Sequence, residues 1–426
     1  MTIQEMIDRA RVAVDTIKDY DQAQVDKLVY EAAKTIYKNA VWLAEEAVEE
    51  TGLGFVEDKI AKNTDTPTAF WDYLKDKKSV GIIEEIPSLG LIKVAHPIGV
   101  IAAITPATNP TVTPLGNFMH TMKGKNAVII SPAPRAEKTS TDTVNLIREA
   151  LKKCGAPEDL IQIVPEVTIA KSAELMEKCD LVIATGSSGL TKAAYSSGTP
   201  AYGVGPGNPP VILDSDNLLL YPQEEEAEWF EALREAGIVV FDKKEDVDKL
   251  RAGFFNGEGK LKSELTGKNA DVFAAAGGFD IDNKVKVIAL KIDEVGKADP
   301  LGKEILGPVV VLKSYDKYED AVALAIKNME ESGGIGHTAG IFTHDEKHVE
   351  YAAERIQVAR LLINQPTPDA WGPATNALSP AVSEGCGTWG NNILAGNVDY
   401  IHMVNVSQVL KPLDVTLPNG EELFAD

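Results

Sequence analysis

The residues of this sequence that could do chemistry lie in short glycine-rich or polar loops. The best candidate is the turn Gly186-Ser187-Ser188-Gly189, which follows an apolar run and precedes a helix-like segment. In such a turn, backbone N–H groups and the N-terminus of the next helix can face an anion without a charged side chain. The turn therefore predicts a phosphate-binding site, although a plain strand-to-helix turn has the same composition. Neither this turn nor GVGPGN fits the G-x-G-x-x-G dinucleotide fingerprint, because GVGPGN precedes a strand.

Cysteine thiolates are strong nucleophiles, and this chain has only three cysteines: Cys154, Cys179 and Cys386. Their spacings match neither a zinc site nor a disulfide framework, which predicts reduced thiols in a reducing compartment and no metal centre. Cys154 ends a helix-like segment and Cys179 precedes a strand-like one, so both are expected to be small packing residues. The sequence around Cys386, GCGTWGNN, offers neither a helix N-terminus nor a cationic neighbour that would activate its thiol.

The elements that must position the loops alternate regularly between residues 100 and 216. Short apolar runs such as VIAAI, AVIIS and LVIAT alternate with helix-like segments, which is typical of parallel strands buried on both faces. Ligands of such doubly wound sheets bind beyond the carboxyl ends of the strands. Four loops fall near those ends, over residues 105–109, 131–135, 186–189 and 203–208.

Other regions complete the predicted architecture. Residues 2–52 and 66–75 have helical spacing, and the β-rich runs around Pro87-Ser88-Leu89-Gly90 predict a hairpin. Helices and strands alternate again from Trp229 to Thr343, and DYIHMVNVSQVLKP predicts a strand that joins a sheet with the hairpin across a dimer interface. The predicted fold class is α/β, with two doubly wound Rossmann-like lobes and a β-hairpin for oligomerisation. The expected domains are a first lobe over 1–79 and 97–216, a second lobe over 217–395, and an oligomerisation element over 80–96 and 396–426.

Composition excludes several classes of protein. The 426 residues are 44% hydrophobic and 25% charged, and no apolar run approaches the roughly 20 residues of a membrane span. The N-terminus MTIQEMIDRARVAV has no signal-peptide core, so we expect a cytoplasmic globular protein with no membrane partner. The net charge of −22 argues against a nucleic-acid partner, which requires a dense patch of lysine and arginine.

Seven motifs, in order, resemble those of the CoA-acylating branch of the aldehyde dehydrogenase superfamily. They are HPIGVIAAITPATNP, VIISPAPRAEK, LVIATGSSGLTKAAYSSGTPAYGVGPGN, KEILGPVVV, GGIGHTAGIFT, ARLLINQPTP and EGCGTWGNN, and they span nearly the whole chain. The branch includes acetaldehyde, propionaldehyde and sulfoacetaldehyde dehydrogenases and the N-terminal half of the bifunctional aldehyde–alcohol dehydrogenase. The resemblance implies the aldehyde dehydrogenase fold, a homodimer or homotetramer, and reversible oxidation of a short-chain aldehyde with NAD⁺ and coenzyme A to an acyl-CoA. That chemistry requires a cysteine thiolate, which forms a thiohemiacetal and then a thioester, and an oxyanion pocket.

The resemblance also assigns roles to individual residues. Asn109 matches the oxyanion asparagine, whose amide donates a hydrogen bond to the forming alkoxide; from the sequence alone it could equally cap a helix that begins near Pro110. Glu304 resembles the glutamate that binds the nicotinamide ribose hydroxyls, with a solvated glutamate as the alternative. The implied cofactor-binding residues are Thr105, Pro106, Ala107, Thr108, Ser131, Pro132, Arg135, Gly186, Ser187, Ser188, Gly189, Gly205, Gly207, Glu304 and Leu306.

Substrate and cofactor identity stay open at this level. Asn364 and Pro366 resemble the wall of the aldehyde tunnel, but they do not select among acetaldehyde, propionaldehyde and sulfoacetaldehyde. Residues 131–135 resemble the loop that holds the adenosine part of NAD, and Arg135 could favour the 2′-phosphate of NADP. His337 titrates near neutral pH like any imidazole, yet a glycine-flanked histidine is more often a turn residue, so no catalytic role is expected.

The nucleophile that the resemblance implies is missing. In the family, the GVGPGN strand is followed by an aspartate-rich turn, a helix and a loop of the type S-K-x-F-D-N-G-x-x-C-x-S-E-Q, whose cysteine attacks the aldehyde. Here PPVILDSD runs directly into NLLLYPQEEEAEWFEAL, which resembles the strand and helix beyond that loop, so the segment is absent near residues 216–219. Cys386 lies in a turn that the family has in addition to its nucleophile, and is therefore expected to be structural.

Two explanations of the missing segment follow. A real deletion would give a catalytically silent nucleotide-binding or scaffold homologue. Alternatively, the natural protein carries a segment that this sequence omits. Deleting a helix and its loop from a packed domain should cost much of the roughly 5–15 kcal/mol of net stability, which favours the omission. A hydrolytic relative that makes free acids is disfavoured because the loops match the acylating branch.

Overall fold

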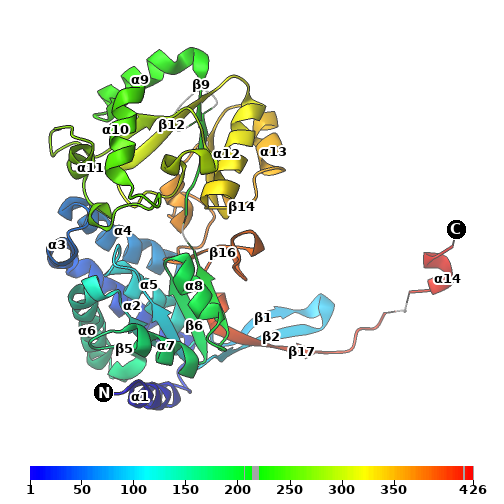
Figure 1. The fold of residues 1–426 in the computed structure, drawn as a ribbon. Helices are drawn as coiled ribbons and strands as arrows, with labels where there is room; N and C mark the ends of the chain where they lie inside the picture. The colour runs from blue at the N-terminus through cyan, green and yellow to red at the C-terminus, as the bar shows by residue number, and fades with distance from the viewer. Residues whose placement is uncertain (206, 214–219, 416–417, 426) are drawn as a thin grey trace.

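The computed structural model describes residues 1–205, 207–213, 220–415 and 418–425. Two α/β lobes lie one above the other, and a β-ribbon and an extended C-terminal arm project from the first lobe (Figure 1). Each lobe is built on a parallel sheet, and the ribbon is antiparallel. The predicted fold class, two doubly wound lobes with a hairpin, is confirmed.

The first lobe contains a five-stranded parallel sheet in the order β5-β4-β3-β6-β7. Its strands are β3 (Val100–Ile104), β4 (Ala127–Ser131), β5 (Ile161–Ile163), β6 (Leu181–Thr185) and β7 (Ala201–Val204). Every residue of β3 and β4 is buried, because helices cover both faces of the sheet. The helices of this lobe are α1 (Ile3–Thr16), α2 (Gln22–Lys38), α3 (Ala40–Thr51), α4 (Val56–Leu74), α5 (Val112–Lys123), α6 (Glu137–Lys153), α7 (Ile169–Lys178) and α8 (Ser188–Tyr195).

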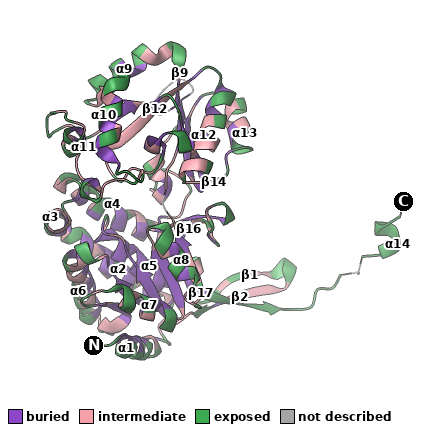
Figure 2. Cartoon of the chain, viewed as in Figure 1, coloured by how far each residue is buried: buried purple, intermediate pink, exposed green. Residues whose placement is uncertain are grey.

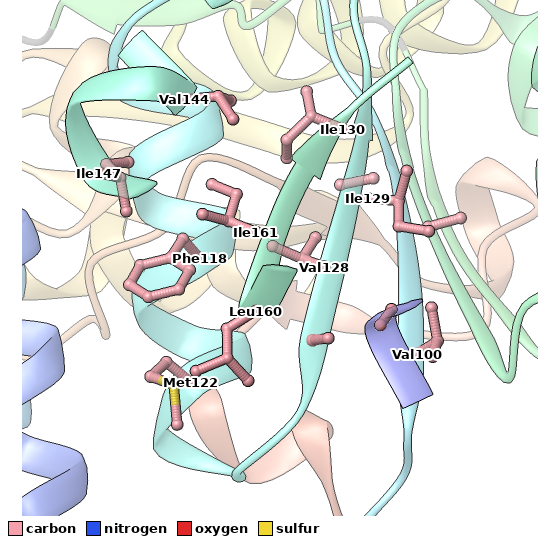
Figure 3. Close-up of a cluster of buried hydrophobic side chains, with 14 of the residues drawn as sticks. Val100, Phe118, Met122, Val128, Ile129, Ile130, Val144, Ile147, Leu160 and Ile161 are labelled. Atoms are coloured by element: carbon pink, nitrogen blue, oxygen red, sulfur yellow. The ribbon is translucent and has the colours of Figure 1, made fainter. Parts of the chain in front are cut away.

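The core of this lobe explains why the apolar runs fold as central strands. Figure 3 shows side chains of β4 and β5, such as Val128, Ile130 and Ile161, packed with Phe118 of α5 and Ile147 of α6. All five are completely buried, and burying such a side chain contributes about 1.5–3 kcal/mol. This packing holds the carboxyl ends of β3, β4 and β6, where the predicted loops begin.

The helix predicted over residues 66–75 is longer in the structure, where α4 begins at Val56 and continues through Pro67. The sequence suggested a later start because proline breaks a helical hydrogen bond but is tolerated in a first turn. Packing outweighs this penalty: Pro67 and Phe70 are buried, and the ring of Phe70 stacks on His120 of α5 at a centroid distance of 5.0 Å. The extra turns of α4 bring new side chains to the space between the lobes.

The second lobe contains a seven-stranded parallel sheet in the order β10-β11-β12-β9-β8-β13-β14. Its strands are β8 (Val211–Leu213), β9 (Leu220–Pro222), β10 (Val239–Phe241), β11 (Ile288–Lys291), β12 (Val309–Tyr315), β13 (Gly336–Phe342) and β14 (Val358–Ile363). Its helices are α9 (Glu226–Glu235), α10 (Lys244–Phe254), α11 (Ala270–Ala276), α12 (Tyr318–Ser332) and α13 (Glu346–Ala353). A small antiparallel pair, β15 (Glu384–Cys386) and β16 (Ala395–Asn397), follows.

The β-ribbon has three strands from one chain. The predicted hairpin forms from β1 (Gly81–Ile86) and β2 (Leu91–Pro97), and β17 (Val404–Leu410) pairs with β2 along its whole length. The C-terminal strand thus forms a sheet with the hairpin, as predicted, and the dimer interface stays a prediction. Beyond β17, residues 411–415 and α14 (Gly420–Leu423) are exposed (Figure 2). No helix in the described part of the chain is long and apolar enough to cross a membrane.

Candidate active site between the lobes

A cavity of about 730 Å³ lies between the lobes and gathers residues from distant parts of the chain. Three of the four predicted loops border it, together with the loop before β12. The predicted residues that line it are Pro106, Thr108, Asn109, Gly186, Ser187, Ser188, Gly205, Gly207, Glu304 and Leu306. Loops separated by up to 200 residues in the sequence therefore meet at one space.

Asn109 lies on this cavity between the end of β3 and the start of α5. Its side chain does not cap α5, whose N-cap is Thr111 with no side-chain cap bond. Instead, Asn109 Oδ1 accepts a hydrogen bond from Lys62 Nζ of α4 at 3.2 Å. Among the residues that the structure describes, none accepts a hydrogen bond from Asn109 Nδ2. The amide nitrogen is thus available to a ligand.

The glycine-serine turn forms the N-terminus of α8. Ser187 is the N-cap, and its Oγ accepts a hydrogen bond from Leu190 N at 3.4 Å. Because Gly186, Ser187 and Ser188 border the cavity, the positive end of this helix is in a position to stabilise an anionic group of a ligand. Gly207 forms part of another wall and has no room for a side chain, since a Cβ at this position would come within 2.9 Å of the His337 ring.

Glu304 contributes the only carboxylate among the predicted residues. It borders both the main cavity and a second cavity of about 350 Å³ that also includes Gly207 and Asn208. Burial raises the pKa of Glu304 to about 7, so a large part of its carboxyl is protonated at neutral pH. An ionised carboxylate in this place accepts hydrogen bonds from ligand hydroxyls.

The remaining predicted residues do not line the cavity. Four of them are buried, namely Thr105, Ala107, Ser131 and Pro132. Two others, Arg135 and Gly189, are exposed. Asn364 adopts a left-handed conformation with φ of 53°, and its amide is used within the fold, since it bonds to the backbone N–H and C=O of Thr343 at 2.9 Å each. Pro366 precedes a short 3-10 helix. Roles for these residues in cofactor or aldehyde binding stay predictions.

Three charged side chains on the cavity were not predicted, namely Lys62, Asp65 and Glu384. Lys62 reaches it from α4, and Glu384 reaches it from β15. Glu384 Oε2 lies 3.8 Å from His337 Nε2 and 3.8 Å from Arg360 Nε. Burial, with a smaller contribution from the nearby Arg360, lowers the pKa of His337 to about 4, so the imidazole is neutral in the physiological range. No local pattern marks Lys62 or Glu384, because each is a single charged residue within an ordinary segment.

None of the three cysteines borders the cavity. Burial raises the pKa of Cys179 to about 11. Burial also raises the pKa of Cys386, although Arg360 opposes the shift, and its Sγ lies 3.8 Å from the Glu384 carbonyl oxygen. A raised pKa disfavours the reactive thiolate. In the described residues, no group of three histidine, cysteine or acidic side chains could hold a metal ion.

The sheet of the second lobe has an unusually short connection. Strands β8 and β9 are parallel neighbours, and only six residues, 214–219, join Leu213 to Leu220. Neighbouring parallel strands normally need a crossover of about 10–12 residues or more, usually with a helix. The strand and helix expected beyond the missing segment are present as β9 and α9. The predicted gap, near residues 216–219, lies outside the described residues.

The model of the aldehyde dehydrogenase family matches residues 1–215 and 292–374 of this chain. The succinate-semialdehyde dehydrogenase (acetylating) of Clostridium kluyveri is 42% identical over 450 aligned positions, which cover 100% of this chain and 99% of the relative. The sulfoacetaldehyde dehydrogenase of an Acholeplasma species is 34% identical, with 99% and 93% covered. Because this chain has 426 residues, at least 24 of the 450 positions are occupied only in the Clostridium protein.

Solved structures agree with these sequence matches. An acetylating aldehyde dehydrogenase from Geobacillus thermoglucosidasius superposes with a TM-score of 0.92 at 33% identity, and 98% of each chain is covered. A probable aldehyde dehydrogenase from Listeria monocytogenes superposes with a TM-score of 0.91 at 27% identity, with 99% of this chain and 98% of that chain covered.

Proposed function

This chain belongs to the aldehyde dehydrogenase family, and from that premise we propose that it oxidises a short-chain aldehyde to an acyl-CoA. A nicotinamide cofactor accepts the hydride, and coenzyme A accepts the acyl group. The observation that carries the proposal is the cavity between the lobes, where Asn109, the first turn of α8 and Glu304 meet. Its volume of about 730 Å³ lies within the range of about 300–1,000 Å³ that cofactor and ligand sites occupy. The relatives named as acetylating enzymes support the acylating reaction.

The residues around the cavity fit a dinucleotide. The N-terminus of α8 can hold the pyrophosphate, and Glu304 can accept hydrogen bonds from ribose hydroxyls. When bound, the nicotinamide supplies the hydride acceptor. We propose the first lobe, residues 1–79 and 97–216, as the NAD-binding domain. NADP is the alternative, because the exposed guanidinium of Arg135 could pair with a 2′-phosphate.

Asn109 is proposed to stabilise the oxyanion. When a thiolate adds to an aldehyde, the carbonyl oxygen gains negative charge, and a preorganised N–H donor lowers the barrier. Asn109 Nδ2 meets this need, since its Oδ1 is held by Lys62 and its nitrogen has no acceptor among the described residues.

We further propose that the active enzyme carries a longer connection between β8 and β9, and that this connection supplies the nucleophilic cysteine. The six-residue link between parallel neighbours supports this, as do the additional aligned positions of the Clostridium relative. The rival is a chain that is truly shortened, binds nucleotide and catalyses nothing.

Mass spectrometry of the intact protein from its natural source distinguishes the two. A mass of 45.8 kDa, which is that of this sequence, would establish the shortened chain, whereas a mass larger by a helix and a loop would establish the longer connection. The longer protein should form NADH from a short aldehyde only when CoA is present, and thiol alkylation should abolish the reaction. Absence of turnover with every short aldehyde would refute the proposed activity.

The aldehydes to test first follow from the relatives. Succinate semialdehyde and sulfoacetaldehyde, which appear in the names of similar enzymes, each carry an anionic group. Acetaldehyde and propionaldehyde are the uncharged comparison. A preference shows as a ratio of kcat/KM values between charged and uncharged aldehydes.

A homodimer or homotetramer is proposed from the ribbon. One edge of β17 pairs with β2, and along its length Val406, Val409 and Leu410 are exposed. An exposed apolar edge strand is a ready template for pairing with another chain.

A further inference from the structure

Two lysines of α4 reach the loop that carries Asn109. α4 lies at the top of the first lobe and faces the second (Figure 1). Lys59 and Lys62 are three residues apart, and therefore on one face of the helix. Lys62 Nζ donates to Asn109 Oδ1 at 3.2 Å, and Lys59 Nζ donates to the carbonyl oxygen of Thr108. In the described parts of the chain, no carboxylate lies within 4 Å of either ammonium group.

The surroundings of these two lysines disfavour their charged forms. Lys59 is buried, with 8% of its surface exposed, and burial lowers its pKa to about 8, with a further contribution from Lys62. Lys62 is accessible because it lies on the cavity wall, yet the surrounding protein lowers its pKa, while Asp58 opposes the shift. Two like charges one turn apart also repel each other.

The chemistry of an ammonium group fixes the orientation of its partner. A side-chain amide can turn over and exchange its oxygen and nitrogen positions, and only its neighbours decide which orientation it takes. A protonated lysine can only donate hydrogen bonds, so the atom of Asn109 that faces Lys62 must be Oδ1. Nδ2 is then left for the cavity. A charged donor on Oδ1 also polarises the amide and strengthens its N–H groups as donors.

We propose that Lys62 is a positioning residue, which locks the Asn109 amide so that Nδ2 donates to the oxygen of a bound carbonyl ligand. Lys59 holds the backbone one residue earlier and keeps the loop in reach. The proposal rests on the proposed function for the identity of the ligand, an aldehyde, but the orientation of the amide does not depend on turnover.

Binding of butyramide to the purified chain tests the proposal without a nucleophile. Its neutral carbonyl accepts a hydrogen bond from Nδ2 but is not a counter-ion for Lys62. NMR titration should give a dissociation constant at least fivefold weaker for Lys62→Met and within twofold of the parent for Lys62→Arg, which preserves the charged donor. Lys62→Glu should abolish binding, because a carboxylate only accepts and must draw Nδ2 away from the cavity. Lys75→Met, which changes the exposed C-cap residue of the same helix, should bind like the parent.

Several results would overturn the proposal. Equal butyramide affinity in the parent, Lys62→Met and Lys62→Glu would do so, as would no butyramide binding by the parent. If Lys62→Met weakens butyrate but leaves butyramide unchanged, Lys62 is an anion partner and does not position Asn109. A cooperative thermal unfolding transition verifies that each variant is folded. If Lys62→Met does not fold, Lys62→Gln takes its place. If no acyl-CoA forms but the butyramide pattern holds, the proposed activity fails and the positioning role stands.

Discussion

Glu304 should make the stability of this protein depend on pH in a way that one substitution removes. Its pKa rises from 4.5 to about 7 in the folded chain, which at 1.36 kcal/mol per pH unit corresponds to about 3 kcal/mol. A carboxyl whose pKa is raised by folding destabilises the fold when it is ionised in both states. The destabilisation by Glu304 is absent below pH 4.5, grows as the pH rises, and reaches its full value above pH 7.

Glu304→Gln keeps the shape of the side chain and removes its charge. At pH 8 the variant should be more stable than the parent by up to about 3 kcal/mol, and at pH 5 by less than about 1 kcal/mol. At about 2–4 °C per kcal/mol, a gain of about 3 kcal/mol corresponds to a rise of about 6–12 °C in the unfolding temperature at pH 8. Glu258→Gln, on an exposed loop of the same lobe, is the control and should change the pH dependence little.

The same variant should bind nucleotide less well. A charge-assisted hydrogen bond contributes about 1.5–3 kcal/mol, so NAD should bind at least tenfold more weakly to Glu304→Gln at pH 8, as measured by calorimetry. A stability gain that is equal at pH 5 and pH 8 would refute the raised pKa. An unchanged affinity for NAD would refute the contact with ribose.

Three further outcomes are expected. In the enzyme that carries the nucleophile, Asn109→Ala should lower kcat by about 10²–10³-fold without a change in NAD affinity by calorimetry; a loss below threefold contradicts the oxyanion role. Arg360→Met leaves the carboxylate of Glu384 without its buried cation. The free energy of unfolding, measured in urea, should therefore fall by about 3–5 kcal/mol. An unchanged free energy of unfolding would mean that the ion pair does not stabilise the fold. Val409→Asp places a charge on the exposed strand β17 and should shift any oligomer toward monomer in light scattering, whereas unchanged mass would locate the interface elsewhere.

The sequence predicts the first lobe well because its strands leave a simple pattern. VIAAI and AVIIS are apolar at every position, as strands buried on both faces must be, and the loops that follow them meet at the sheet edge as expected. Asn109 and Glu304, 195 residues apart, were both assigned by resemblance and border the same cavity.

The residues that the sequence could not reveal act across long distances. Lys62 contacts Asn109, which is 47 residues away in the sequence. The helix predicted over residues 66–75 did not include Lys62, whereas α4 does. Glu384 of β15 lies near both His337 of β13 and Arg360 of β14. The pairing of β13 with β14 brings these two residues close together. Such contacts depend on how helices and strands pack against one another. Helical spacing and strand alternation predict the elements but not their packing.

The adjacency of β8 and β9 has a consequence for protein engineering. Ile212 and Leu220 are already paired across the sheet, so the two ends of any inserted segment would start close together, and a longer loop between nearby ends costs little additional closure entropy. The second lobe can therefore serve as an acceptor scaffold. Segments that bear different nucleophiles, taken from different relatives, could be grafted between the same two strands to exchange one chemistry for another beside an unaltered nucleotide site.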